Sequence, residues 1–195
     1  MTKQRLMNCT FKYFSKKGYN ASLSEISKCC GIKKQSIYNH FKNKDDLFYQ
    51  VIDEEVSTFF KDKIEEFSNL QIESPEEKLK AIFFSFINYY KDIEKLRFWR
   101  FILFIESEEL FLKSRDLIRE KEIEFAKNII GEFEKVLSKN NPEVVLNNSI
   151  AATQTFMTCI HGILDGFMLY RGVFDIDILA NNVWNLFWNG VERTN

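Results

Sequence analysis

Proline occurs only twice in this chain of 195 residues, and each proline directly follows a residue that can cap a helix. In Ser74-Pro75-Glu76-Glu77 the serine offers an N-cap, the proline takes the first helical position and a glutamate takes the third. Asn141-Pro142 begins in the same way, and glycine is also scarce, with seven copies. Because so few residues interrupt a helix, the sequence predicts an all-α fold.

Three short helices are predicted near the N-terminus. A capping box, Ser22-x-x-Glu25, starts the second of them, because each side chain can satisfy a free backbone N–H of the first turn. Gly31 ends this helix, since glycine accepts the left-handed conformation found after a helix C-terminus. A short helix, a turn with glycine and another short helix are typical of a helix-turn-helix. The three helices are expected over 3–17, 22–31 and 34–40.

Longer helices are predicted for the rest of the chain, in which no linker, repeat or low-complexity segment is found. Asn43 and Asp46 form the expected cap of the first, which begins near Lys44 and keeps apolar residues at helical spacing as far as Phe59. The others are expected near 75–92, 94–105, 109–138, 142–171 and 177–193, which brings the total to about nine helices.

The formal net charge of −1 conceals an uneven distribution of charge. Residues 1–50 hold ten lysine or arginine residues against three acidic ones, whereas the remaining residues hold 17 against 25. A basic N-terminal region joined to an acidic body indicates a polyanionic partner for the N-terminal region alone. The alternative is that charges are spread unevenly over solvated helix faces.

Residues 28–44 have the composition of a segment that reads the major groove of DNA. They contain five lysines and no carboxylate, interleaved with amide, hydroxyl and imidazole side chains. Lysines supply salt-dependent contacts to phosphates, and Gln or Asn can pair with adenine edges. On an α-helix that begins near Lys33, Gln35 and Asn39 would share one face, with Ile37 and Phe41 on the inner side. Gln35 and Asn39 are therefore the first candidates for base readout.

The spacing of residues over roughly 4–52 resembles the N-terminal pattern of the tetracycline-repressor (TetR) family. The matching residues are Gly18-Tyr19, Ser22, Ile26, Gly31-Ile32, Ile37-Tyr38, His40-Phe41 and Lys44-Asp45-x-Leu47-Phe48. The resemblance implies a three-helix helix-turn-helix domain over 1–47, in which Tyr38, His40 and Lys44 contact phosphates and 33–39 form the recognition helix. It also implies a C-terminal helical domain for ligand binding and dimerisation over 48–195.

The predicted DNA-binding residues combine the lysine-rich segment with the positions that the resemblance implies. They are Lys33, Lys34, Gln35, Ser36, Tyr38, Asn39, His40 and Lys44. Two positions depart from the family, because Lys33 stands where Ser or Thr usually caps the recognition helix and Gln35 where a small residue is usual. No arginine occurs between Arg5 and Arg97, so an arginine fork to guanine is absent and an A·T-rich operator is expected. For single residues, ordinary packing or solvation is the alternative.

The segment 79–125 is rich in aromatic residues, which can fill a core and can also line an apolar pocket. We expect the body to bind a small apolar or aromatic effector that moves the fourth helix and so changes the spacing of two DNA-binding heads. The candidate pocket residues are Phe86, Tyr90, Trp99, Phe156 and His161. For each of them, core packing is the alternative.

The last two helices carry apolar residues on more than one side, so each needs a second cover besides its own core. Gly162 and Gly166 indicate close approach of another backbone, because glycine inside a helix costs about 1 kcal/mol relative to alanine. Segments 160–166 and 184–190 resemble the family's C-terminal pattern, which implies a four-helix bundle across the two-fold axis of a homodimer. Such a dimer would read a palindromic operator. The candidate interface residues are Ile160, Leu164, Phe167, Met168, Leu179, Val183 and Phe187.

Other classes of function find less support in the sequence. The chain has two histidines and none of the common catalytic motifs, so neither an enzyme nor a cofactor is expected. A thiol- or metal-responsive regulator that uses Cys9, Cys29 and Cys30 is one alternative, with buried packing thiols as the simpler interpretation. An architectural DNA-binding protein without a ligand is another. No signal peptide and no apolar run of about 18 to 20 residues is found, so a cytoplasmic protein outside the membrane is expected.

Overall fold

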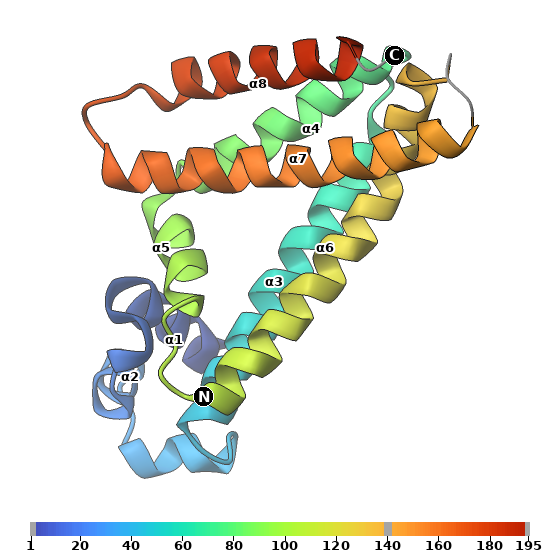
Figure 1. Ribbon diagram of the computed structural model, residues 1–195. Helices are drawn as coiled ribbons and strands as arrows, with labels where there is room; N and C mark the ends of the chain where they lie inside the picture. Colours follow the sequence, from blue (N-terminus) through green and yellow to red (C-terminus); the bar gives the residue numbers. More distant parts are fainter. Residues whose placement is uncertain (1–2, 139–141, 194–195) are drawn as a thin grey trace. The chain divides into compact units, whose positions relative to one another are not determined.

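The computed structural model describes residues 3–138 and 142–193, and over these residues the chain is helical and contains no strand (Figure 1). The elements are α1 (Lys3–Lys17), η1 (Gly18–Asn20), α2 (Leu23–Cys30), η2 (Lys34–Asn39), α3 (Lys44–Asn69), α4 (Pro75–Tyr90), α5 (Ile93–Ile102), α6 (Glu108–Val136), α7 (Pro142–Leu169) and α8 (Ile176–Arg193). All nine predicted helices are present in this part of the chain, so the predicted all-α fold is confirmed. Two short elements differ from expectation: η1 was not predicted, and the third predicted helix is η2, a 3-10 helix.

The capping box at the start of α2 is formed in both directions. The Glu25 backbone N–H donates to Ser22 Oγ at 3.2 Å, and the Ser22 backbone N–H donates to the Glu25 carboxylate at 3.1 Å. Glu25 also pairs with Lys17, and the bonds from Lys17 and Ser22 lower the pKa of Glu25 to about 2. Gly31 then ends α2 in the left-handed region, at φ +67°.

Two further caps follow the sequence expectation. The Asp46 backbone N–H donates to Asn43 Oδ1 at 2.8 Å where α3 begins. The Glu77 backbone N–H donates to Ser74 Oγ at 3.3 Å where α4 begins. Asn141, the expected cap of α7, lies outside the described residues. The helix boundaries of the long elements therefore follow from local hydrogen bonding that the sequence encodes.

The chain forms two compact units, and each consists of two segments of sequence. We call residues 1–60 with 91–121 the N-terminal unit, and residues 61–90 with 122–195 the C-terminal unit. The helices α3 and α6 contribute residues to both units. The boundary expected between residues 47 and 48 concerns the division of function, and it stays a prediction.

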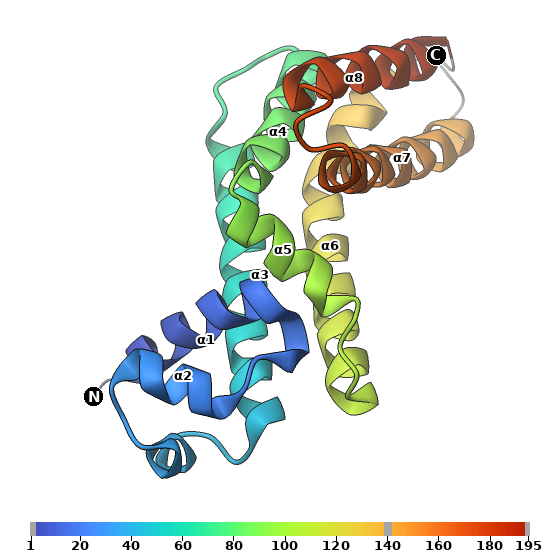
Figure 2. The same ribbon diagram turned by 90° about the vertical axis from the view of Figure 1, so that its left-hand side faces the viewer.

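The core of the N-terminal unit is built where α1 packs on α2 and α5 (Figure 2). Phe98 of α5 is fully buried, with ring centroids 5.0 Å from Phe11 and 5.3 Å from Phe14 of α1. Phe14 also meets Phe48 of α3 edge to face at 5.1 Å. The first helix thus shares its core with α5, a helix much further along the sequence.

Gly18 joins α1 to η1 under two constraints. Its φ is +58°, a conformation that residues with a Cβ rarely adopt. A Cβ at this position would also stand 3.2 Å from the ring of Phe101, at the end of α5. The turn after α1 therefore needs glycine both for its backbone and for its contact with α5.

The C-terminal unit is built around α4, α7 and α8, and α7 and α8 run side by side in Figure 1. Its core is aromatic: Phe156 of α7 lies 5.5 Å from Phe83 of α4 and 6.2 Å from Phe187 of α8, measured between ring centroids. Trp184 stacks on Trp188 at 5.5 Å. These rings add to the apolar area that the unit buries, and such burial is the main favourable term in folding.

Two charged clusters are built into the same unit. Glu132 of α6 is buried and receives Lys78 of α4 at 3.1 Å and Lys135 at 2.9 Å. Lys63 of α3 is buried, pairs with Glu66 at 2.9 Å and donates to Ser85 of α4. Each buried charge therefore has a partner of opposite sign, which offsets the cost of removing it from water.

None of the described helices has both the length and the apolar character that a membrane span requires.

Candidate nucleic-acid interface

The predicted recognition segment forms the six-residue 3-10 helix η2. Two buried apolar residues anchor it in the core of the N-terminal unit. Ile37 is fully buried and Phe41 nearly so, as the sequence pattern predicted. Most of the other residues of 33–40 are exposed, with Ser36 half-buried and the Tyr38 side chain 50% exposed. The buried pair fixes the segment on the N-terminal unit and leaves its polar side chains free to meet a partner.

The 3-10 geometry changes which side chains of η2 lie together. A 3-10 helix turns once in three residues, so positions i and i+3 are stacked and positions i and i+4 are not. Gln35 therefore lies in line with Tyr38, and Ser36 lies in line with Asn39. The expectation that Gln35 and Asn39 share one face assumed an α-helix, and it does not hold in η2.

The start of η2 lacks a side-chain cap. Lys33 has the extended backbone of an N-cap residue, with φ −74° and ψ 144°, but no side-chain cap hydrogen bond is made. An ammonium group can only donate, so it cannot accept from the free N–H groups of the first turn. The Ser36 N–H instead donates to the Lys33 carbonyl at 2.9 Å. Lys33 stands where the TetR family usually has Ser or Thr, and it therefore leaves the start of η2 without a side-chain cap.

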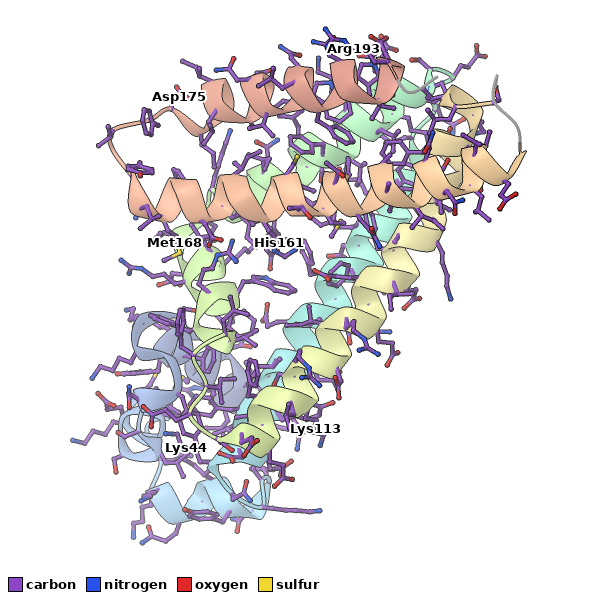
Figure 3. All side chains as sticks on the ribbon, viewed as in Figure 1. Lys44, Lys113, His161, Met168, Asp175 and Arg193 are labelled. Carbon is purple, nitrogen blue, oxygen red and sulfur yellow. The ribbon has the colours of Figure 1, made fainter. Side chains whose placement is uncertain are left out.

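Lys44, labelled in Figure 3, is held inside the unit rather than extended from it. Its Nζ donates to the Tyr19 carbonyl and lies 4.1 Å from the centroid of the Tyr19 ring. Burial lowers the pKa of Lys44 below that of a free lysine. Lys44 therefore connects η1 to the start of α3. If its ammonium group also contacted a phosphate, it would do so while keeping these internal contacts.

His40, the next predicted phosphate contact, is exposed, and its ring lies 6.4 Å from that of Phe41.

A single carboxylate beside Lys44 links three segments of the N-terminal unit. Asp45 accepts a hydrogen bond from Tyr19 Oη of η1 at 2.6 Å and another from Ser107 Oγ, just before α6, also at 2.6 Å. Burial and then the bond to Asp45 raise the pKa of Tyr19 to about 12. Sequence reasoning did not single out Ser107, because no pattern near it marks a contact with a residue so distant in the chain.

Comparison with known sequences identifies this N-terminal region. Residues 6–51 match the profile of the family described as bacterial regulatory proteins, tetR family. Over 51 residues the chain is 39% identical to the HTH-type transcriptional regulator AcrR of Shigella flexneri, a stretch that covers 26% of this chain and 24% of AcrR. The match therefore covers about a quarter of the length of AcrR and is limited to a stretch the size of one module.

Solved structures resemble the chain over nearly its whole length. The regulator FadR of Bacillus subtilis in complex with stearoyl-CoA has a TM-score of 0.73 at 20% identity, covering 95% of this chain and 97% of FadR. SmeT of Stenotrophomonas maltophilia, the repressor of the efflux pump SmeDEF, has a TM-score of 0.70 in its triclosan complex, at 16% identity, with 96% and 90% covered. At these identities the likeness concerns the fold. The resemblance to the tetR family thus consists of a matched N-terminal segment, residues 6–51, and a shared fold.

The expected effector residues are divided between the two units. Phe86, Tyr90 and Phe156 are buried in the C-terminal unit, where Phe86 lies 5.0 Å from Phe125 between ring centroids. His161 belongs to the same unit and is exposed, with its Nε2 3.1 Å from a Glu122 carboxylate oxygen. Trp99 belongs to the N-terminal unit and packs on Phe59 at 5.1 Å. Their role as a pocket lining stays a prediction.

The expected dimer residues fall into three groups by exposure. Ile160, Leu164 and Phe187 are buried in the chain's own core, Phe167, Leu179 and Val183 are half-buried, and Met168 is exposed. Figure 3 labels Met168 near the end of α7 and Asp175 and Arg193 at the two ends of α8. Ile160 and Leu164 therefore have little surface to offer a partner, and the free face of α7 and α8, the side that bears their exposed residues, is formed by other residues.

A groove between α7 and α8 lies on that free face, and of its lining residues only Phe187 was among the predicted interface residues. Its volume is about 360 Å³, and it is lined by Asn148, Ala151, Ala152, Thr155, Leu186, Phe187, Gly190 and Val191. The Leu186 side chain is 75% exposed beside it, and Ile178 and Ile150 are also exposed on these helices. Small residues at spacings of four, such as Ala151 and Thr155, were the signal in the sequence that could have indicated a face open to another helix.

The thiols of the alternative hypothesis are also placed in the N-terminal unit. Cys9 Sγ and Cys29 Sγ lie 2.7 Å apart, and Cys30 Sγ lies 3.7 Å from the Arg5 carbonyl oxygen. Among the described residues there is no group of three or more His, Cys, Asp or Glu side chains that could hold a metal ion.

Proposed function

We propose that this chain is a one-component transcriptional regulator of the TetR family, acting as a repressor, that binds double-stranded DNA and responds to a small apolar or aromatic molecule. The observation that carries the proposal is the exposed polar surface of η2 over its buried anchors Ile37 and Phe41, in a segment without carboxylates. Exposed lysines there suit phosphate contacts, and exposed amides suit adenine edges. The proposed contact residues are Lys33, Lys34, Gln35, Ser36, Tyr38, Asn39, His40 and Lys44.

Phosphate contact by η2 is tested by removing one exposed lysine at a time. Lys34→Ala should weaken binding to all duplex sequences alike and reduce the slope of log affinity against log salt by about 1. Lys127→Ala, which removes an equally exposed lysine from α6, should leave both quantities unchanged. Equal losses for the two variants would show that general charge, and not η2, binds the duplex.

The operator is proposed to be an A·T-rich palindrome with half-sites about one helical turn, ~34 to 36 Å, apart. This follows from the absence of arginine between Arg5 and Arg97 and from the two-fold symmetry of a homodimer. Selection of binding sites from random DNA tests it directly. Recovery of G·C-rich half-sites, or of single sites without a palindrome, would contradict the operator proposal.

The homodimer is proposed to form across the free face of α7 and α8. The groove next to Leu186 and the exposed Ile178 support this, because a two-fold contact lets each copy insert a protruding side chain into the groove of the other. Leu186→Asp should convert the dimer into monomers and lower operator affinity. Ile123→Asp changes an exposed isoleucine of α6 in the same way and should leave the dimer intact. Sedimentation measures both, and a monomeric wild-type chain would refute the dimer.

The effector is proposed to be an apolar or aromatic small molecule bound by the aromatic-rich body. Support comes from the packing of Phe86, Tyr90 and Phe156 and from the two structural relatives, which carry stearoyl-CoA and triclosan. These two molecules are therefore the first probes. Either molecule should raise the melting temperature of the protein when it binds. It should also release operator DNA if it binds more tightly to the conformation that has low affinity for the operator. If a panel of lipophilic compounds changes neither quantity, the effector proposal fails while DNA binding can stand.

A further inference from the structure

Two thiols from different helices meet in the N-terminal unit. Cys9 lies on α1 and Cys29 on α2, and their sulfur atoms are 2.7 Å apart where the two helices pack together. A disulfide bond is about 2.05 Å long, so the sulfurs need to approach by only about 0.7 Å. Cys30 Sγ lies 3.7 Å from the Arg5 carbonyl oxygen and its thiol also interacts with that of Cys9, so Cys9 has two neighbouring thiols on α2, and the 2.7 Å contact selects Cys29 as the disulfide partner.

We propose that Cys9 and Cys29 form a reversible disulfide that ties α1 to α2 when the protein meets a hydroperoxide. Cys29 is partly exposed, whereas the Cys9 side chain is 8% exposed, so the oxidant reaches Cys29 first. This assigns different roles to the two thiols: Cys29 reacts with the peroxide, and Cys9 resolves the product.

The chemistry balances without a further reactant. The Cys29 thiolate takes one oxygen atom from the hydroperoxide as the O–O bond breaks, and the remaining alkoxide leaves as the alcohol with the thiol proton. Cys9 sulfur then attacks the sulfenic sulfur of Cys29, the S–O bond breaks, and the hydroxide leaves as water with the Cys9 proton. The two thiols lose two electrons and two protons, and the peroxide becomes one alcohol and one water.

The surroundings set the threshold of the reaction. Burial raises the pKa of Cys9, and the hydrogen bond to Cys9 raises the pKa of Cys29, while Arg5 and Lys12 of α1 act in the opposite direction. Cys30 adds to the rise at Cys9. Since the thiolate is the nucleophile, oxidation accelerates as pH rises.

The crosslink also stabilises the N-terminal unit. It closes a loop between residues 9 and 29, which removes conformational freedom from the unfolded chain. The close approach of the two sulfur atoms in the folded chain favours formation of the bond. The oxidised protein is expected to melt a few degrees higher than the reduced protein.

The full-length protein tests the proposal with hydrogen peroxide as the probe. Of the four titratable thiols, two should disappear and return after treatment with dithiothreitol. Peptide mapping without reductant should recover Cys9 linked to Cys29. Persistence of all four thiols under excess peroxide at pH 9, or a link involving Cys30 or Cys159 instead, would overturn the assignment.

Single variants separate the roles of the two thiols. Cys9→Ala should stop the reaction at the sulfenic acid of Cys29, which dimedone labels, whereas Cys30→Ala and Cys159→Ala should still form the disulfide. If Cys9→Ala fails to fold, the peptide map of the wild-type protein still decides the question. Neither readout needs an operator, so loss of the disulfide and failure of the DNA-binding proposal are distinguishable.

Discussion

Asp45 shows how much of the N-terminal unit depends on one residue. Its two carboxylate oxygens accept from Tyr19 and Ser107, so one side chain joins η1, the start of α3 and the turn before α6. Neither bond joins neighbours in the sequence, and both donors are hydroxyls that bind a charged acceptor more strongly than a neutral one. Asp45 is not one of the predicted DNA-contact residues, yet its carboxylate positions the start of α3, which follows η2 in the chain.

Replacement of this carboxylate by an amide should loosen all three segments. Asp45→Asn keeps one acceptor and presents an N–H₂ to the other hydroxyl, so we expect a loss of about 1 to 2 kcal/mol in the free energy of unfolding. Urea unfolding measures it. Asp116→Asn, which changes an exposed carboxylate of α6, should stay within about 0.5 kcal/mol of the wild type.

The same variant has a signature in alkali. The pKa of Tyr19 is about 12 in the folded chain against 10 for a free tyrosine, so its neutral form stabilises the fold below pH 10 and this contribution is lost as pH rises through 12. In Asp45→Asn the tyrosinate absorbance of Tyr19 should appear at lower pH. An unchanged titration would mean that burial alone, without the Asp45 bond, sets the pKa of Tyr19.

At the scale of elements, local signals in the sequence predicted where most helices begin and end. The Ser22–Glu25 box, the Asn43 cap and Gly31 act through neighbours within a few residues, so a single sequence contains all that is needed to recognise them. The form of η2 was not predictable in this way. Over six residues a period of 3.0 and one of 3.6 differ too little to be told apart, and only the missing cap at Lys33 hinted at the difference.

The site in the body was harder to predict for a related reason. A helix with two apolar stripes shows that it is covered twice, but not which stripe faces its own core. Ile160 and Leu164 turned out to face inward, while the face toward solvent carries Ala151 and Thr155. Likewise, the sequence pattern around Phe156 is the same whether its ring packs in the core or lines a pocket. Such choices depend on tertiary contacts between distant segments.

Supplying the missing cap should strengthen η2. Lys33→Ser places an acceptor on a residue whose backbone already has the conformation of an N-cap, and we expect a gain of about 0.5 to 1 kcal/mol in the free energy of unfolding. Lys34→Ser removes the same charge one residue later without offering a cap, and it should give no gain. Thermal unfolding compares the two, and equal shifts would mean that charge alone was responsible.

The two left-handed glycines of the N-terminal unit should respond differently to alanine. Gly31→Ala meets open space, so its cost is that of the backbone conformation, about 1 kcal/mol. Gly18→Ala adds the contact with the Phe101 ring and should cost at least 1 kcal/mol more. Urea unfolding of both variants gives the order, and a smaller loss at Gly18 would show that α5 yields easily.

At the scale of the whole molecule, each compact unit is assembled from two separate stretches of sequence. The N-terminal unit illustrates the consequence, because Phe98 of α5 fills the space beside Phe11 and Phe14 of α1. Contacts of this range make the unit cooperative across distant parts of the chain. A structural boundary therefore cannot be drawn as a single point along the sequence.

Truncation of Phe98 should destabilise the helices of the proposed DNA-binding head although it lies far from them in sequence. We expect Phe98→Ala to lose about 3 to 5 kcal/mol, as is usual for a buried phenylalanine. Phe104→Ala, on a ring that is 74% exposed a few residues later, should change stability by less than about 0.5 kcal/mol. Hydrogen exchange of α1 and α2 amides locates the loss, and unaltered protection there would refute the shared core.

The insertion of Phe98 against α1 also limits how chains of this fold can be recombined. A hybrid that takes residues 1–47 from one relative and everything else from another would set one parent's α1 against the other parent's α5, with mismatched volumes at the contact. An exchange that keeps this core intact has to carry residues 91–121 together with the first sixty. The operator preference proposed for the N-terminal unit is thus portable only as a discontinuous graft.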